Sequence, residues 1–342
     1  MSQYASSLET IHIVLSIWDL TDVYNRHASV TMVSILVSTS HPVHFHLLYD
    51  EERSKVNPKL AERNKSRYHE LVDKYGAEVD FYHVSVPYSV KKLPFVQVYT
   101  EGALLRFYIP DLFKQYEKII YLDTDIIVRR DIHDLWNKNI SQYSLAAVNS
   151  RLSKSYVRKY QKVGINPDNY FNSGVMLFNL EKILAENTTS NDYFTMLVNN
   201  PGFEWPDQDV LNKYYSDSVF LLPEEYNKFT GLRERIEYDN MILHFAGRVK
   251  PWSLYQGGAD KYYWKYLTMT PWGKDVCEII TSLLGAPNIE HSLNMAPKWL
   301  GQMWPREQLQ NIWKLSIQIP IRALWFDIKY LILHRLLGKN SV

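Results

Sequence analysis

The chain contains very little cysteine: among 342 residues only Cys277 carries a thiol, so an internal disulfide is excluded. A reducing compartment, the cytoplasm, is the simplest expectation for such a chain. No run of about 18 uncharged apolar residues occurs, which argues against a membrane-spanning helix. The opening sequence MSQYASSLET has neither a basic start nor an apolar stretch, so we expect no secretory signal.

An excess of charge of one sign is also missing. Lysine and arginine number 38 against 37 acidic residues, and the resulting net charge of +1 argues against a general nucleic-acid-binding protein. Hydrophobic residues, by contrast, make up 46% of the chain and aromatic residues 14%. This is enough for a sizeable core in one large domain with an extension, or in two domains.

Apolar segments of strand length alternate with segments of helical pattern along the first three quarters of the chain. This alternation predicts an α/β fold with a mostly parallel sheet and helices on both faces. After about residue 256 the alternation fades, so we place a domain boundary there and expect 256–342 to form a small helical extension. The expected strands are 11–18, 43–50, 77–84, 118–123, 145–149, 174–180 and 241–246, and the expected helices are 26–39, 57–75 and 99–107.

Two carboxylates end one of these strands. In YLDTDIIV, an apolar run leads directly into Asp123 and Asp125. Ligands of open α/β sheets bind at the carboxyl ends of the strands, and two adjacent acids there suit Mg²⁺, Mn²⁺ or Ca²⁺. A solvated turn is the alternative, since the same spacing recurs at Asp207 and Asp209.

Three further motifs carry polar groups in similar positions. WPDQDVLNKYY predicts a helix from Pro206 with Asp207 at its N-terminus, and Gln208 beside it offers an amide that suits sugar binding. In HFAGRVKPW, His244 ends an apolar strand, and Lys250 follows with a charge that suits phosphate. In YFNSGVMLFNL, Asn172 precedes another strand. Taken singly, these residues also fit a helix cap, a structural histidine and an ordinary turn.

Together, in this order, the motifs YLDTDIIV, FNSGVMLFNL, DQDVLN and HFAGRVKPW resemble glycosyltransferase family 8, the retaining enzymes of the GT-A fold that use nucleotide sugars. The opening strand and YNRHASVTMVSIL extend the resemblance to residues 11–255. It is strongest toward bacterial galactosyl- and glucosyltransferases that build surface glycans. The resemblance therefore implies that 1–255 is a nucleotide-sugar-binding catalytic domain.

The resemblance also implies a metal site. Asp123, Asp125 and His244 would bind Mn²⁺, with Mg²⁺ as the other candidate. The metal would bridge the donor diphosphate, which Lys250 and Gly247 would contact from the other side. Mixed oxygen and nitrogen ligands suit Mn²⁺ better than Ca²⁺.

The remaining family positions concern the donor. Tyr24 matches the aromatic residue that stacks on uracil, which implies UDP-galactose or UDP-glucose. Arg106 matches a basic residue that reaches the donor, and Asn172, Asp207 and Gln208 match positions around the transferred sugar. Because Gln208 is a poor nucleophile, we expect front-face return of the acceptor, with Asp207 as nucleophile in the alternative mechanism.

Two departures from the family pattern leave questions open. The turn SIWDLTDVYN is about two residues longer than usual, so Asp19 and Asp22 compete for contact with the base. Asn149 stands where many members carry a sugar-contacting acid, which leaves glucose and galactose both open. The alternatives to transfer onto a lipid- or protein-linked glycan are a sugar-phosphate nucleotidyltransferase and an inactive glycan-binding relative.

The C-terminal segment 310–342 carries five basic residues against one acid. Ile321, Leu324, Ile328 and Leu331 share a helix face that Arg322 and other basic residues flank, so we expect an interfacial helix on the inner face of the plasma membrane. The protein would then be cytoplasmic and peripheral. A helix docked on the main domain or on a partner subunit is the alternative.

Overall fold

The computed structural model describes residues 8–18, 22–93, 101–230, 238–247, 250–252 and 258–274. Within them a seven-stranded sheet has the order β3-β2-β1-β4-β7-β6-β8, and a three-stranded sheet has the order β5-β10-β9. The strands are β1 (Ile11–Ile17), β2 (Val43–Asp50), β3 (Glu78–Val84), β4 (Lys118–Leu122), β5 (Ile126–Val128), β6 (Leu145–Asn149), β7 (Phe171–Asn179), β8 (Val219–Leu222), β9 (Lys228–Phe229) and β10 (Ile242–His244).

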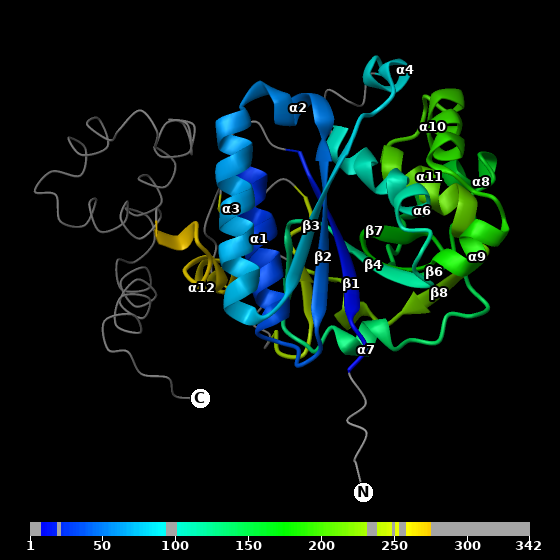
Figure 1. Ribbon diagram of the computed structural model, residues 1–342. Coiled ribbons are helices and arrows are strands. Elements are labelled where there is room, and N and C mark those ends of the chain that lie inside the picture. Colours follow the sequence, from blue (N-terminus) through cyan, green and yellow to red (C-terminus); the bar gives the residue numbers. More distant parts are fainter. Residues whose placement is uncertain are drawn as a thin grey trace, which may run out of the picture.

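Helices connect the strands and cover the sheet (Figure 1). Their ends follow local chemistry: α3 begins at Pro58, where Asn57 caps the Leu60 N–H, and it ends at Gly76 with φ +67°. The helices are α1 (Val23–Leu36), α2 (Glu51–Val56), α3 (Pro58–Tyr75), α4 (Tyr88–Lys91), η1 (Glu101–Tyr108), α6 (Ile109–Leu112), α7 (His133–Trp136), α8 (Lys154–Lys162), α9 (Leu180–Ala185), α10 (Ser190–Asn199), α11 (Pro206–Tyr215), η2 (Glu224–Tyr226) and α12 (Asp260–Leu267).

The large sheet is parallel except at β7, which runs antiparallel to both β4 and β6. The carboxyl ends of β1 and β4 therefore meet the start of β7 at one edge of the sheet. Strand β5 continues from β4 after a short turn and joins the small sheet, where it pairs antiparallel with β10. This edge collects residues from three separate parts of the chain.

A hydrophobic core lies on each face of the large sheet. On one face, β1 and β2 pack against α1, α3 and α12, with Ile13, Met32 and Tyr263 among the buried residues. On the other face, η1, α10 and α11 cover β4 and β7. Helix α1 is buried over most of its surface, and its Thr31 hydroxyl donates to the carbonyl oxygens of Thr124 and Ile126, at 3.1 and 2.8 Å. The helix thus fixes the turn that carries the two acids.

The α/β architecture with a mostly parallel sheet confirms the fold class expected from the sequence. Several details differ from the expected elements. Helix α1 begins at Val23, three residues earlier than predicted, and the predicted helix at 99–107 is a 3₁₀ helix from Glu101. Strand β7 begins at Phe171, so Asn172 lies within it and does not precede it, and β10 covers only Ile242–His244. Among the described residues, no helix combines the length and hydrophobicity that a bilayer crossing requires.

The domain boundary near residue 256 stays a prediction. Beyond it, the described residues 258–274 pack against α1, and the Trp272 indole N–H donates to Asp22 at 2.9 Å. The segment 310–342, on which the membrane prediction depends, lies outside the described residues.

Candidate active site

Backbone hydrogen bonds bring Asp123, Asp125 and His244 together at the carboxyl edge of the sheet. The Asp123 N–H donates to the Gly174 carbonyl at 2.9 Å, which ties the end of β4 to β7. The Phe245 N–H donates to the Asp125 carbonyl at 3.1 Å, and His244 pairs with Ile126 across the small sheet. All three side chains therefore sit on ordered strand ends.

The three side chains offer a set of metal ligands. The His244 Nε2 atom lies 3.4 Å from Asp125 Oδ1 and 3.9 Å from Asp123 Oδ2, and one ligand atom of each residue lies within 4.8 Å of the others. Two carboxylates with one imidazole suit Mn²⁺ or Mg²⁺ better than a thiophilic metal. The residues present thus fit a divalent cation.

Gly174 leaves the space that this cluster needs. A Cβ atom at this position would collide with His244 Cε1 and would lie 2.8 Å from Asp123 Oδ2. Any larger residue would push the histidine and the carboxylate apart. The glycine in FNSGVMLF therefore has a steric role that its φ angle does not reveal.

A chain of hydrogen bonds fixes the tautomer of His244. The Gly174 N–H donates to Asn172 Oδ1 at 3.0 Å, so this amide oxygen also accepts from Asn227 Nδ2, at 2.7 Å. Asn227 Oδ1 then faces His244 Nδ1 at 2.9 Å and requires a proton there. In the neutral ring, Nε2 keeps its lone pair and faces the two carboxylates, as a metal ligand must.

Two basic residues hold the acids from opposite sides. Arg106, which is only 4% exposed, donates to Asp123 Oδ1 at 2.7 Å and lies 3.1 Å from Asp207 Oδ2. Lys250 donates to Asp125 Oδ2 at 2.5 Å. Burial raises the pKa of Asp123 although Arg106 opposes it. For Asp125 burial also disfavours the charged form, but the Lys250 ammonium opposes it, and the pKa lies well below its ordinary value.

Asp207 and Gln208 lie in the first turn of α11 beside this cluster. The Gln208 Oε1 atom accepts from Asn172 Nδ2 at 2.9 Å and from the Ser173 N–H at 3.2 Å, so the amide oxygen is oriented by a fixed donor. Asp207 Oδ2 accepts from the Ser173 hydroxyl at 2.9 Å. Both side chains are largely buried, at 9% and 8% exposed.

The second Asp-x-Asp pair is divided between two environments. Asp209 points away from the cluster and accepts from Tyr170 OH at 2.5 Å and from the Glu204 and Trp205 N–H groups. Tyr170 in turn accepts from Gln208 Nε2 at 3.0 Å. Desolvation raises the pKa of the fully buried Asp209. Asp209 thus supports the helix start, and Asp207 faces the site.

The other residues singled out from the sequence lie around this centre. Tyr24 is 37% exposed on α1 and lies edge-on to His27, whose ring stacks on Trp252. Asp22 forms an ion pair with Arg63 at 2.7 Å. None of these contacts involves Asp123, Asp125 or His244 directly.

Two expected positions have simple backbone roles in the structure. Gly247 has φ +93°, a conformation that favours glycine. Asn149 donates to the Asp168 carbonyl at 2.6 Å and accepts from the Arg151 N–H. Asp19 lies outside the described residues, so its competition with Asp22 stays open.

Sequence reasoning missed the residues that orient the centre, above all Asn227 and Tyr170. Asn227 precedes β9 in EYNKF, where nothing local distinguishes it from a turn residue. Tyr170 directly precedes FNSG, and its position at a strand start was the only available signal. Both act through contacts of long sequence separation, which a linear motif does not reveal.

Comparison with solved structures shows that this fold is the GT-A fold of glycosyltransferases. The galactosyltransferase LgtC, solved with donor and acceptor sugar analogs, superimposes with a TM-score of 0.61 over 76% of this chain and 96% of its own, at 20% identity. The bifunctional glycosyltransferase WbbM also superimposes with a TM-score of 0.61, at 20% identity over 81% of this chain. The match covers 52% of WbbM, so this chain spans about half of that longer protein.

The sequence comparison then gives the family. Residues 16–255 match the model of Glycosyl transferase family 8, and the chain belongs to this family. General stress protein A of Bacillus subtilis is 27% identical over 77% of this chain and 95% of its own length. A lipopolysaccharide 1,2-glucosyltransferase of Escherichia coli is 23% identical over 74% of this chain and 77% of its own. The membership confirms the resemblance read from the motifs.

Proposed function

We propose that this chain transfers galactose or glucose from a UDP-sugar to a glycan acceptor with retention of configuration. The observation that carries the proposal is the cluster of Asp123, Asp125 and His244. It lies at the carboxyl edge of the sheet, in the space that Gly174 leaves, and its residues belong to the motifs that resemble the family. Membership of a glycosyltransferase family supports this reaction over nucleotidyl transfer to a sugar phosphate. The intact cluster argues against an inactive glycan-binding relative.

The metal proposed for this cluster is Mn²⁺, with Mg²⁺ as the other candidate. Bound there, it would offset the negative charge that grows on the leaving diphosphate. The protein contributes a His244 lone pair held in place by Asn227, and two carboxylates held by Arg106 and Lys250. Fixed groups of this kind need no reorganisation during the reaction.

The donor is proposed to lie along the same edge. Lys250 and Gly247 would contact the diphosphate, and Tyr24 would stack on uracil beside Asp22. Lys250 already bonds the Asp125 carboxylate and the Phe245 carbonyl, each at 2.5 Å, so diphosphate would share an ammonium whose position is fixed. Arg106 serves the donor site by holding Asp123 and Asp207, since its guanidinium is bonded to both.

For sugar transfer we propose that Gln208 positions the donor and does not attack it. Its oxygen already accepts two hydrogen bonds, and Asp207 is paired with Arg106, so both are weakened as nucleophiles. The bond between the sugar C1 and the diphosphate oxygen breaks, with its electron pair leaving on UDP. The acceptor oxygen then bonds to C1 from the same face, and its proton passes to the departing phosphate.

The acceptor is proposed to be a lipid- or protein-linked glycan of a bacterial surface. The support is the likeness to lipopolysaccharide glucosyl- and galactosyltransferases, at 23% and 24% identity. Peripheral contact with the inner face of the plasma membrane is a further part of the proposal. It rests on the sequence of 310–342 alone.

A donor hydrolysis assay tests the proposal. The chain is incubated with Mn²⁺ and a panel of UDP-sugars without acceptor, and release of UDP is measured. We expect slow hydrolysis of UDP-galactose or UDP-glucose that EDTA abolishes, and the preferred donor identifies the transferred sugar. Pyrophosphate release from UTP and a sugar phosphate, with no UDP release from any donor, would refute the proposal.

A further inference from the structure

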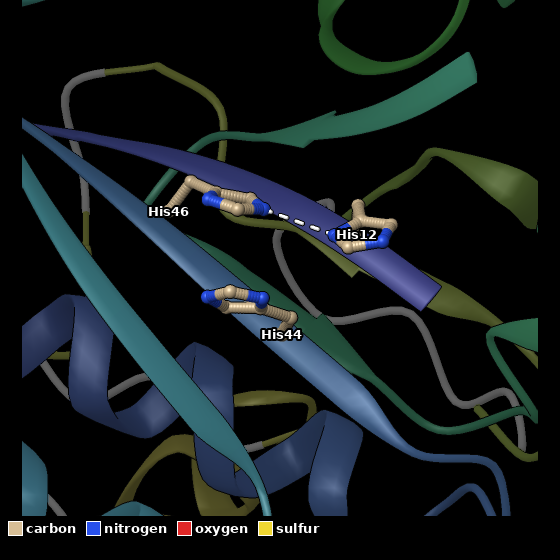
Figure 2. A group of neighbouring side chains, drawn as sticks. All are labelled: His12, His44 and His46. Carbon is tan, nitrogen blue, oxygen red and sulfur yellow. Dashed lines mark hydrogen bonds between the residues drawn. The ribbon is translucent and has the colours of Figure 1, made fainter. Parts of the chain in front are cut away.

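A second group of metal-ligating side chains lies at the opposite edge of the large sheet. His12 on β1 pairs in register with His44 on β2, and side chains two residues apart on a strand share a face, so His46 joins them. Figure 2 shows the three imidazoles gathered over these two strands, with His12 and His46 joined by a hydrogen bond. No motif considered from the sequence includes them.

The spacing of the three imidazoles is compatible with a metal site. His12 Nδ1 lies 3.1 Å from His46 Nε2, and one nitrogen of each of the three rings lies within 4.8 Å of the others. Zn–N bonds of about 2.0–2.1 Å place the nitrogens of a tetrahedral site about 3.3–3.4 Å apart. Two of the three nitrogens are therefore already spaced for a metal.

The surroundings supply the outer contacts that metal-binding histidines use. Asp80 on β3 bonds His44 Nε2 at 3.0 Å and so orients the ring, as outer carboxylates do for metal-binding histidines. Tyr82 OH lies 3.2 Å from His46 Nδ1. Because a phenol both donates and accepts, Tyr82 permits either tautomer of His46, including the one that exposes the Nε2 lone pair.

The charge around the cluster also favours a cation. The carboxylate of Glu78 lies 3.5 Å from His44 Nδ1, and Asp80 adds a second negative charge. His46 is fully buried, whereas the His44 side chain is 15% exposed, so a metal could enter from the His44 side.

From this geometry we infer a second metal site, formed by His12, His44 and His46, which binds a divalent transition-metal ion that prefers nitrogen, with Zn²⁺ the leading candidate. Three imidazoles select Zn²⁺, Cu²⁺ or Ni²⁺ over Mn²⁺ and Mg²⁺, the reverse of the preference at the acidic cluster. The site holds β1 and β2 together at their amino ends.

The position of this site separates it from sugar transfer. Since Ile13 pairs with Ile120, His12 lies level with Ile119, four residues before Asp123 on β4. At about 3.3 Å per residue this is about 13 Å along the sheet. The inferred metal is therefore structural, and it does not depend on the proposed function.

Zinc binding to the full chain tests the inference. The protein is stripped with a chelator, excess Mn²⁺ is added to occupy the acidic cluster, and the stoichiometry and affinity of Zn²⁺ binding are then measured by calorimetry. We expect one zinc to remain bound in the wild type and in Asp125→Asn. In His44→Gln and His12→Gln the affinity should fall at least tenfold, and His69→Gln on the exposed face of α3 serves as the control.

X-ray absorption on the zinc-loaded Asp125→Asn protein gives a test that needs no histidine variant to fold. We expect three imidazole nitrogens around the metal. Fewer than three, or unchanged zinc affinity in folded His44→Gln and His12→Gln, would overturn the inference. Donor hydrolysis by His44→Gln should remain at the wild-type level, so failure of this inference and failure of the proposed function give different results.

Discussion

The two edges of the large sheet carry two clusters of opposite chemistry. At the carboxyl edge, two acids and one histidine lie between Arg106 and Lys250, so cations already neutralise part of the negative charge. At the amino edge, three histidines lie beside the acids Glu78 and Asp80. The oxygen-rich first arrangement suits a hard cation, and the three imidazoles of the second suit a softer one.

The difference also lies in how each cluster is held. The acidic cluster lies where chain segments far apart in sequence meet: the Gly174 carbonyl of β7 accepts from the Asp123 N–H, and Asn227 bonds the His244 ring. The histidine cluster lies on adjacent strands, where the alternation of side chains places it on one face. The predictions below separate the two clusters experimentally.

The largest effect is expected from Asp125→Ala. Loss of this carboxylate removes a metal ligand and frees Lys250, and loss of such an electrostatic group costs about 10²–10³ in rate. Mn²⁺-dependent donor hydrolysis should fall by this factor while zinc binding at the histidine cluster is unchanged. Asp73→Asn on the exposed surface of α3 is the matched control, and near-normal turnover of Asp125→Ala in EDTA would contradict the assignment.

Gly174→Ala should separate the acids from His244 without removing any ligand. The added Cβ overlaps the histidine ring, and such overpacking costs about 1–3 kcal/mol, or about 5- to 150-fold in Mn²⁺ affinity. Gly202→Ala is the control, because nothing within 4 Å would meet its Cβ. Equal Mn²⁺ affinities of the two folded variants in a titration would show that Gly174 has no steric role.

Asn227→Ala should release His244 from its fixed tautomer. Loss of the residue that hydrogen-bonds the second ring nitrogen of a metal-binding histidine lowers metal affinity about 10–100-fold. We therefore expect the Mn²⁺ affinity of Asn227→Ala to fall by a factor in this range. Asn199→Ala, at the exposed end of α10, should change nothing. If Asn227→Ala binds Mn²⁺ as tightly as the wild type, the hydrogen-bond chain from Gly174 does not orient the histidine.

A smaller effect concerns His27, a buried imidazole of α1 outside both clusters. Desolvation lowers its pKa well below 6.5, so the folded state keeps the ring neutral while the unfolded state takes up a proton below that pH. The contribution of His27 to the free energy of unfolding is therefore fully present above about pH 6.5. It falls as the pH decreases below this value, by up to about 1.4 kcal/mol per pH unit. His27→Phe, which keeps a ring against Trp252, should reduce this slope in urea unfolding between pH 6 and 5. An unchanged slope would show that His27 does not remain neutral.

The sequence predicted the fold class and most strands of the large sheet, because hydrophobic alternation acts locally. The strands at 11–17, 43–50 and 118–122 match their apolar runs, and Pro206 begins α11 as expected. The antiparallel direction of β7 was not predicted, because strand direction depends on which neighbour a strand pairs with. The 3₁₀ geometry of η1 likewise has no local signature.

The sequence by itself determined the motifs and, through them, the family. The residue types and the order of Asp123, Asp125, Gln208 and His244 can be read directly from the chain. Only the tertiary structure decided which atoms meet. Gly174 leaves space for the histidine and Asp123, and Asn227 bonds both Asn172 and His244, all across long sequence separations. The pairing of β1 with β2 similarly places His12 beside His44 and His46. Spacing along a chain specifies the partners of a residue only within one helix or strand, so contacts between elements must come from the packed fold.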